Sequence, residues 1–313
     1  MNLGIQIVSF GVMLTIAVIY FLNKHIKLLS TRIYTLYLSV SLFYSVFEGC
    51  TIYTLYHIDT IDPFINRLAH QLFIGSLVLI LMFLFIYIDI LTRKQKRYKL
   101  IEFIIRILPA LLSLVITAFG RIDYHIGSDG RYSYGPVVSM LYACLAVYAL
   151  WTIITVIRRR KSVPSHIMFT ALCGISGWII IGIVQVFNPT WLIESMGVSL
   201  MQLFIFLSVE NPHEYNDMDI SGALNRHAFE MMLKEWCENG KGFFVVTFTL
   251  ANSELLKNSV GVSEVYNILG WAALKLTTVL RSDYYHTSDN SISFIVKHKA
   301  CCDKRIRSDF DKT

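Results

Sequence analysis

The chain has 313 residues, of which 55% are hydrophobic and only 16% are charged, and its mean hydropathy is +0.54. Soluble domains carry about 25% charged residues, so much of this chain is expected to lie in lipid. The net charge of +6 comes from residues 1–210, which hold sixteen Lys and Arg against nine Asp and Glu. Residues 211–313 hold twelve against thirteen. This distribution argues against a nucleic-acid-binding protein, and the composition excludes a disordered or collagen-like chain and a small secreted disulfide scaffold.

The six cysteines indicate neither a metal site nor a disulfide framework. Three of them lie inside apolar stretches, and Cys301 and Cys302 are adjacent. The sequence has no CxxC pair and no paired Cys and His spacing of the kind that zinc needs. We therefore expect reduced, structural thiols and no bound metal.

Seven stretches are apolar and long enough to cross a membrane. A bilayer core of about 30 Å needs about 20 apolar residues in helical form, because lipid offers no partner to an unpaired backbone group. The predicted spans are residues 3–22, 33–55, 72–91, 101–119, 136–157, 167–187 and 192–207, the last being the shortest. The first has no basic leading segment and no small-residue cleavage site, so we expect a retained span and not a signal peptide.

The positions of Lys and Arg predict the orientation of these spans, since cytoplasmic connections hold the excess of positive charge. The connections after spans one, three and five hold twelve such residues, against three on the alternate connections. The N-terminus is therefore expected outside and everything after span seven in the cytoplasm. The twelve are Lys24, Lys27, Arg32, Arg93, Lys94, Lys96, Arg97, Lys99, Arg158, Arg159, Arg160 and Lys161, and the three are Arg67, Arg121 and Arg131.

Five polar residues inside the spans fall toward the predicted outer side. They are Glu48, His70, Gln71, Gln185 and Glu194. Polar groups at membrane depth are costly and usually face the interior of a helix bundle, so these residues are candidates for a sensory pocket that takes a small extracellular ligand. The alternative is that each lies at the headgroup boundary or bonds to a neighbouring helix.

Charged residues also occur at the predicted inner side. Glu102 and Arg106 are four residues apart on one predicted helix, a spacing that lets a carboxylate meet a guanidinium, and Asp89 ends the preceding span at a similar depth. We expect a structural ion pair between Glu102 and Arg106, with a proton relay as the alternative.

After residue 208 the sequence changes from apolar to polar, which predicts a short linker over residues 209–218 and a cytoplasmic domain over 219–313. In this domain, apolar spacing predicts a helix over 224–237, a buried central strand over 243–250, an amphipathic helix over 262–280 and a second strand over 291–296. Helix, strand, helix and strand indicate an α/β fold. The whole chain is thus expected to be a seven-helix membrane bundle followed by a partial α/β domain.

Several of these residues resemble a known family. The segments LSVENP (207–212) and ISGALNRHAF (220–229) are similar to the opening of a GGDEF domain, whose usual text is D-x-L-T-G-L-x-N-R-x-A-F. Spacing within the helix over 262–280 also resembles that family. The membrane half is similar to the seven-helix sensor modules that precede such domains and histidine kinases in bacteria, especially at YSYGP (132–136).

This resemblance implies an activity and a partner. GGDEF domains join two GTP molecules into cyclic di-GMP, each protomer of a homodimer holding one nucleotide. Two carboxylates hold Mg²⁺ on the triphosphate, because the metal neutralises charge as the 3′-oxygen attacks the α-phosphorus. The family's domain normally continues further than this chain does, so we expect an incomplete domain that is completed by a second protomer, by another protein or not at all.

The sequence departs from the family where the chemistry requires its residues. The first metal-binding Asp aligns with residues 249–251, Thr-Leu-Ala, which contain no acid. Only the final Phe of the signature turn remains in the run Asn290, Ser291, Ile292, Ser293 and Phe294. Asp289 lies outside that turn and is expected to be a solvated loop residue. We therefore expect no catalytic residue, no metal ligand and no cofactor.

The first functional hypothesis is a signalling protein of the bacterial cell membrane, in which a sensor acts on an inactive GGDEF-like domain that works through protein contacts or as a regulatory remnant. The partners would be the bilayer, a homodimer or another GGDEF protein, and no nucleic acid. The first alternative is an active or GTP-binding diguanylate cyclase using Mg²⁺ and GTP. The second is a membrane transporter, although matching broken helices are absent from the two halves of the membrane part.

Overall fold

The computed structural model describes residues 3–93, 98–127, 130–161, 163, 165–188, 190–240 and 242–297. The chain divides into two compact units. The helical unit comprises Met1–Phe21 and Leu29–Glu210, and the α/β unit comprises Leu22–Leu28 and Asn211–Thr313. Outside the described residues lie Lys94, Lys96 and Arg97 of the charge pattern and the adjacent cysteines 301 and 302.

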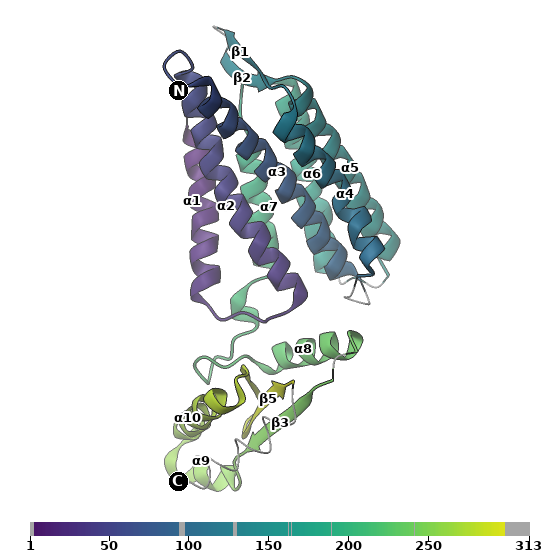
Figure 1. Cartoon of the computed structure of the whole chain (residues 1–313). Helices are drawn as coiled ribbons and strands as arrows, with labels where there is room; N and C mark the ends of the chain where they lie inside the picture. The colour runs from purple at the N-terminus through teal and green to yellow at the C-terminus, as the bar shows by residue number, and fades with distance from the viewer. Residues whose placement is uncertain are drawn as a thin grey trace. The chain divides into compact units, whose positions relative to one another are not determined.

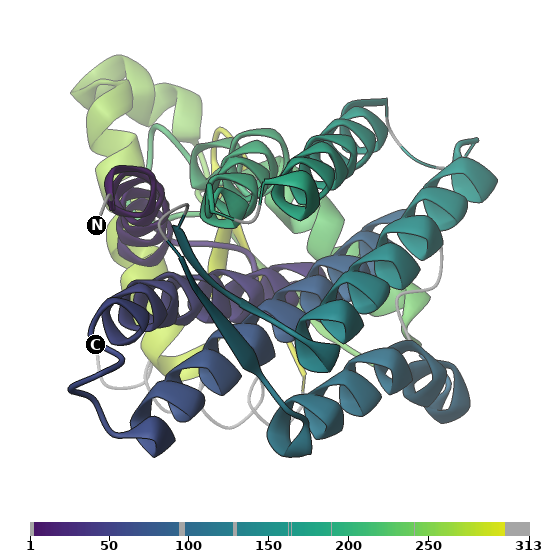
Figure 2. The same ribbon diagram turned by 90° about the horizontal axis from the view of Figure 1, so that it is seen from above.

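Long helices build the helical unit, and they run alongside one another in Figures 1 and 2. Their bounds are α1 Gly4–Leu22, α2 Leu29–Tyr56, α3 Pro63–Thr92, α4 Leu100–Phe119, α5 Pro136–Arg159, α6 Ser165–Phe187 and α7 Glu194–Ser208. Helix α3 lies at the centre and packs against α2, α4 and α5. Its first turn is fixed by Pro63 and by the Asp62 side chain, which accepts a hydrogen bond from the Phe64 N–H at 2.7 Å.

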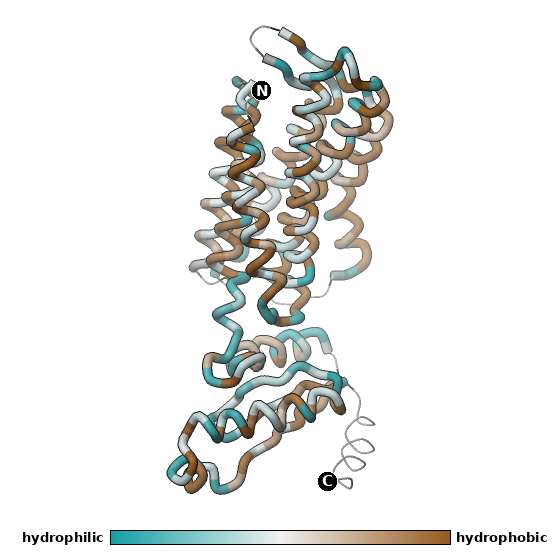
Figure 3. Tube along the Cα trace, turned by 90° about the vertical axis from the view of Figure 1, so that its left-hand side faces the viewer, coloured by the Kyte–Doolittle hydropathy of each residue, from teal (hydrophilic) through white to brown (hydrophobic). Residues whose placement is uncertain are grey.

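Six of these helices, α1 to α6, are long and apolar enough to cross a membrane, counting only the residues that the structure describes. Hydrophobic residues line most of their length in Figure 3. In the most apolar 18-residue stretch of the central helix α3, 72% of the residues are buried within the protein. In α4 the share is 17%, so most of its apolar surface is left for lipid. Helix α7 has 15 residues and is about 22 Å long, less than a 30 Å hydrocarbon core requires.

A β-hairpin between α4 and α5 was not expected from the sequence. Strands β1 (Asp123–Gly127) and β2 (Gly130–Tyr134) pair antiparallel, with Asp123 opposite Tyr134. Each strand has only five residues and carries polar and aromatic side chains without a clear alternation, so no strand pattern is visible in the sequence. The hairpin places the YSYGP segment directly before α5.

The α/β unit contains a three-stranded antiparallel sheet in the order β3–β5–β4. Its elements are η1 Pro212–Glu214, α8 Arg226–Glu238, β3 Phe244–Thr249, α9 Ser253–Val260, α10 Val262–Leu280, β4 Tyr284–Ser288 and β5 Ser291–Val296. The predicted bounds of α10 and β5 are confirmed, and the prediction for α8 is right to within two residues at its start. Helix α9 ends at Gly261, whose φ of +92° favours glycine and separates α9 from α10.

Successive side chains of β5 point to opposite faces of the sheet, and an apolar core with a helix forms on each face. Ile292 and Phe294 join the core formed with α10, whereas Ile295 joins the core formed with α8. Every residue of β5 is buried, and β5 is the central strand.

The prediction of a buried central strand over 243–250 is wrong in its position. β3 is an edge strand of the sheet that the described residues form, and Phe244 and Val245 are 42% and 43% exposed. A run of Phe, Val and Thr gives the strand but not its place in the sheet, because strand order depends on which segments pair. The sequence also missed β4 and α9.

A buried carboxylate joins three helices of the helical unit. Asp89 of α3 is 1% exposed and contacts three arginines at 3.3, 3.0 and 2.8 Å, and it accepts a hydrogen bond from a tyrosine hydroxyl at 2.6 Å. These partners are Arg93, Arg106, Arg159 and Tyr98 in the same order. They follow α3, lie in α4, end α5 and precede α4, so the carboxylate fixes the ends of α3, α4 and α5 relative to one another.

The predicted side-chain ion pair between Glu102 and Arg106 is replaced by other contacts. Arg106 donates to Asp89 and to the backbone oxygen of Glu102, at 3.0 and 2.8 Å, and the Glu102 carboxylate accepts from Arg93 at 2.8 Å. The buried Asp89 attracts Arg106 more strongly than Glu102 does, because the Glu102 side chain is 40% exposed and its charge is screened by solvent.

We expect Asp89→Asn to destabilise the protein strongly, because an amide leaves three guanidinium groups without their buried counter-charge. Breaking a buried ion pair by removing one partner typically costs about 3–5 kcal/mol. The midpoint of thermal unfolding in detergent measures the effect. The matched control is Glu102→Gln, which removes an exposed carboxylate and is expected to cost less than about 1 kcal/mol. Equal losses in the two variants would contradict the central role of Asp89.

A second buried carboxylate lies just after α7. Glu210 is 5% exposed and accepts a hydrogen bond from the Tyr87 hydroxyl at 2.9 Å. Burial raises the pKa of Glu210 from its ordinary value of 4.5 to about 7, although the hydrogen bond from Tyr87 favours the charged form. The folded protein therefore binds more protons than the unfolded chain between pH 4.5 and 7, and stability falls as the pH rises through this range.

We expect the protein to be more stable at pH 5.5 than at pH 8, with Glu210 contributing up to about 2 kcal/mol of the difference. Glu210→Gln removes this contribution and flattens the dependence of the unfolding midpoint on pH. Glu214→Gln, which changes an exposed carboxylate four residues away, leaves the dependence unchanged. A pH dependence that is identical in all three proteins would exclude Glu210 as its source.

Candidate functional site

Four of the five predicted outer residues line one cavity in the helical unit. Glu48 comes from α2, His70 from α3, Gln185 from α6 and Glu194 from the first turn of α7. The centres of water-sized spheres can occupy about 80 Å³ of this cavity, which is room for roughly six water molecules or one small organic molecule. Its other lining residues are Thr51, Ile52, Leu55, Tyr56, Phe73, Ile74, Arg131, Tyr132, Ser133, Val138, Leu141, Tyr142 and Leu192.

The two carboxylates of the cavity differ in their surroundings. Glu48 is 3% exposed, and its Oε2 has no hydrogen-bond partner in the part of the chain that the structure describes. Glu194 is partly buried and hydrogen-bonded to the Tyr142 side chain. An unsatisfied buried carboxylate oxygen is costly, so the wall of the cavity at Glu48 is ready to accept a donor.

Two further polar groups, Gln185 and His70, complete the polar wall. The Gln185 Oε1 accepts from the Ile193 N–H at 2.9 Å, which holds the start of α7 beside α6. His70 Nδ1 lies 2.9 Å from the Asn66 carbonyl oxygen, and its ring meets Tyr124 edge-on. Both contacts fix side chains that face the cavity and limit their freedom to turn away.

The fifth predicted residue, Gln71, does not line the cavity. Its Nε2 donates to the backbone oxygens of Thr117 and Ala118 at 3.2 and 2.9 Å. Gln71 therefore satisfies the last carbonyl groups of α4, which have no partner within their own helix. For this residue the alternative given above, a bond to a neighbouring helix, is correct.

Sequence reasoning missed Arg131, which reaches the cavity from β2. Its Nη1 donates to the carbonyl oxygens of Leu55 and Tyr56 at 3.0 and 2.8 Å, and its guanidinium lies over the Tyr56 ring. The guanidinium thus occupies the carbonyl end of α2, where a cation is favoured. The hairpin that carries Arg131 also brings Tyr132 and Ser133 to the cavity, so the YSYGP motif was the available signal in the sequence.

The run that the resemblance aligns with the GGDEF signature, residues 290–294, is mostly strand. Asn290 is in the turn between β4 and β5, and the other four residues, Ser291, Ile292, Ser293 and Phe294, belong to β5 and are buried. Of the run aligned with the signature turn, only Asn290 is in a turn, and the strand predicted from residue 291 is confirmed. Two hydroxyl contacts, Ser293 with Thr247 and with Thr287 at 3.0 Å, fill the interior where the strands meet.

The two segments that the resemblance would align with metal-binding acids, residues 249–251 and 290–294, lie side by side. The Leu250 N–H donates to the Asn290 carbonyl oxygen at 2.9 Å, and Thr249 pairs with Ser291. The nearest acid in the run, Asp289, is 83% exposed and lies 3.5 Å from the Lys257 Nζ. The β4–β5 turn and the end of β3 are thus close enough to share a metal ion. The groups that lie there, however, bind metal ions poorly.

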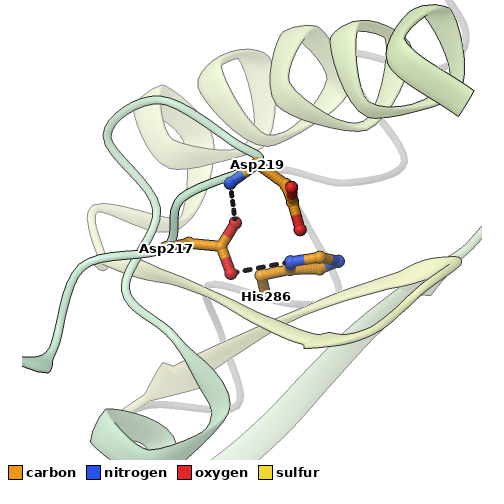
Figure 4. A group of neighbouring side chains, drawn as sticks. All are labelled: Asp217, Asp219 and His286. Atoms are coloured by element: carbon orange, nitrogen blue, oxygen red, sulfur yellow. Dashed lines mark hydrogen bonds and ion pairs between the residues drawn. The ribbon is translucent and has the colours of Figure 1, made fainter.

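One group in the α/β unit has the spacing of metal ligands. The possible metal-ligand atoms of Asp217, Asp219 and His286 all lie within 4.8 Å of one another. Figure 4 shows the three side chains gathered beside β4. Both Asp217 oxygens already have partners: Oδ1 accepts from the N–H groups of Asp219 and Ile220 at 3.0 and 2.8 Å, and Oδ2 lies 2.8 Å from His286 Nδ1. These bonds tie the segment before α8 to β4, so Asp217 is a structural clamp with which a metal ion would have to compete.

Comparison with known proteins adds no family assignment. No family model matches the chain, and no curated protein or solved structure matches it. The functional argument therefore depends on the geometry of the cavity and of the α/β unit.

We expect Asp217→Asn to destabilise the α/β unit by about 1–3 kcal/mol, because it weakens the charged hydrogen bonds that the carboxylate accepts. Asp219→Asn, whose side chain is exposed, is expected to change stability by less than about 0.5 kcal/mol. Chemical unfolding followed by Trp fluorescence measures both. If both variants lost equal stability and EDTA lowered the stability of the unmodified protein, the group would be a metal site and not a clamp.

Proposed function

We propose that this protein is a signalling protein of the bacterial cell membrane, in which a seven-helix sensor acts on a GGDEF-like domain that makes no cyclic di-GMP. Six helices that could span a membrane support the first part. Helix α7 would be the seventh and short span, since Trp191 and the turn at residues 190–193 extend the apolar segment at its start.

The observation that carries the proposal is the contact between the end of β3 and the β4–β5 turn. In a working cyclase these two places would supply carboxylates to Mg²⁺, and here they offer Leu250 and Asn290. Without this pair of acids, the charge that develops on the triphosphate is not neutralised, a contribution worth several kcal/mol. A domain with this geometry and without the acids supports a role in contacts with other proteins.

The excess of Lys and Arg on the connections after α1, α3 and α5 supports an outer N-terminus and a cytoplasmic α/β unit. With seven spans, the two ends of the membrane part lie on opposite sides. The cavity would then open toward the outer side, where an extracellular small molecule could enter, and it would serve as the sensory site.

The edge of β3 supports a means by which the α/β unit could act. Among the described residues, only β5 pairs with β3, and the Phe244 and Val245 side chains are about two-fifths exposed. An exposed edge strand is a ready site for pairing with another chain. A second copy of this domain or another GGDEF protein would fit this edge.

We expect the full chain in lipid nanodiscs, supplied with GTP and Mg²⁺, to form cyclic di-GMP at least about a thousandfold more slowly than an active diguanylate cyclase assayed in parallel. Chromatography with mass detection measures the product. Turnover that Asp289→Asn or Glu264→Gln abolishes would overturn the proposal in favour of an enzyme with an unusual metal site. Binding of GTP without turnover would indicate a nucleotide-responsive signalling domain, and uptake of solute into proteoliposomes would indicate a transporter.

A further inference from the structure

The lining of the outer cavity has an unusual balance of charge. It contains two carboxylates, Glu48 and Glu194, and one guanidinium, Arg131. Neither carboxylate forms an ion pair with a basic residue among those that the structure describes, whereas the Arg131 guanidinium is directed to backbone carbonyl groups and the Tyr56 ring. Both carboxylates line the same cavity, so they face a common space.

Such an arrangement is costly in a protein without a bound partner. A buried carboxylate that lacks both a counter-charge and a full set of hydrogen bonds loses much of its solvation without compensation. The Glu48 Oε2 is in this position, since Glu48 is 3% exposed and that oxygen has no hydrogen-bond partner in the described chain. A cation bound beside Glu48 would offset the cost, and its N–H groups would satisfy the free oxygen.

The shape and the remaining lining favour an organic cation over a metal ion. Searched across the described residues, the ligand atoms of Glu48, His70 and Glu194 do not come close enough to form a metal-binding group, unlike those of the Asp217 clamp. The cavity instead has apolar and aromatic walls, including Ile52 and Phe73. An ammonium ion with an apolar body would match both parts, because the walls could bury the body while the carboxylates bind the charge.

We propose that this cavity binds a small organic ammonium ion, with the charged nitrogen held by Glu48 and Glu194 and the apolar body packed on the walls formed by α2, α3 and α5. The inference rests on the proposed function in that it treats the cavity as the sensory site. It goes further by naming the chemical class of the ligand. Arg131 also lines the cavity, and its guanidinium would attract a carboxylate on the same ligand. Amino acids, which carry both an ammonium and a carboxylate, are therefore also suitable members of this class.

Binding of simple amines to the full chain in nanodiscs tests the proposal. The probes are 2-phenylethylamine, isoamylamine and tyramine, with N-acetyl-2-phenylethylamine as the uncharged analogue and 3-phenylpropanoate as the anion. Titration calorimetry, corrected with empty nanodiscs, gives the dissociation constants. We expect saturable binding of at least one amine, at least tenfold tighter than that of the uncharged analogue or the anion.

Variants then locate the bound nitrogen. Glu48→Gln and Glu194→Gln keep the shape of the side chains and are each expected to weaken amine binding at least tenfold, while Glu102→Gln, which changes a carboxylate away from the cavity, leaves it unchanged. Thermal unfolding shows whether each variant is folded. The proposal is overturned if no amine binds saturably, if the uncharged analogue binds as tightly, or if a folded Glu48→Gln and a folded Glu194→Gln both bind as the unmodified protein does.

The cyclase assay on the same preparations separates this inference from the proposed function. Amine binding accompanied by cyclic di-GMP formation would leave the ligand class standing and overturn the inactive signalling role. If neither amine binding nor cyclic di-GMP formation is found, the proposed ligand class is overturned and the inactive signalling role stands.

Discussion

The packing of α3, α4 and α5 depends on the ion pairs that the buried carboxylate of Asp89 forms with three arginines. Asp89 is almost completely buried near the end of α3, where an isolated carboxylate would be strongly unfavourable. Three arginines and a tyrosine from the ends of α3, α4 and α5 and the segment between them surround it. Two of those arginines, Arg93 and Arg159, are among the residues whose positions predict a cytoplasmic face. The residues from which an orientation is predicted thus also pack the ends of these helices.

Near the other end of α3, buried carboxylates from α2 and α7 lie without arginine partners among the described residues. His70 lies near the start of α3, nineteen residues and about 28 Å of helix away from Asp89. Here the carboxylates of Glu48 and Glu194 face a cavity without a basic partner among the described residues. A protein that pairs Asp89 with three arginines and leaves Glu48 and Glu194 without a basic partner among the described residues is well suited to bind a ligand beside those two carboxylates. This contrast connects the packing of the bundle with its proposed sensory role.

In the α/β unit, the end of β3 and the β4–β5 turn are held together by the backbone and not by reactive side chains. The close contact of Leu250 with Asn290 depends only on backbone hydrogen bonds and strand pairing, which many side chains allow. Metal binding, by contrast, requires particular carboxylates. The contact between these two segments therefore needs no acids, and the buried run of β5 and the clamp at Asp217 show what stabilises the unit.

The sequence alone determined the elements whose cause is local: six apolar spans, set by the thickness of a bilayer, and the bounds of α10 and β5, set by the periodicity of apolar residues. It also brought four cavity residues together, because polar groups in apolar helices turn inward. Only the tertiary structure decided that Arg106 pairs with Asp89, that β3 is an edge strand and that Arg131 joins the cavity. Those outcomes depend on which segments become neighbours, and competition between distant partners is not encoded in the spacing of residues along one helix or strand.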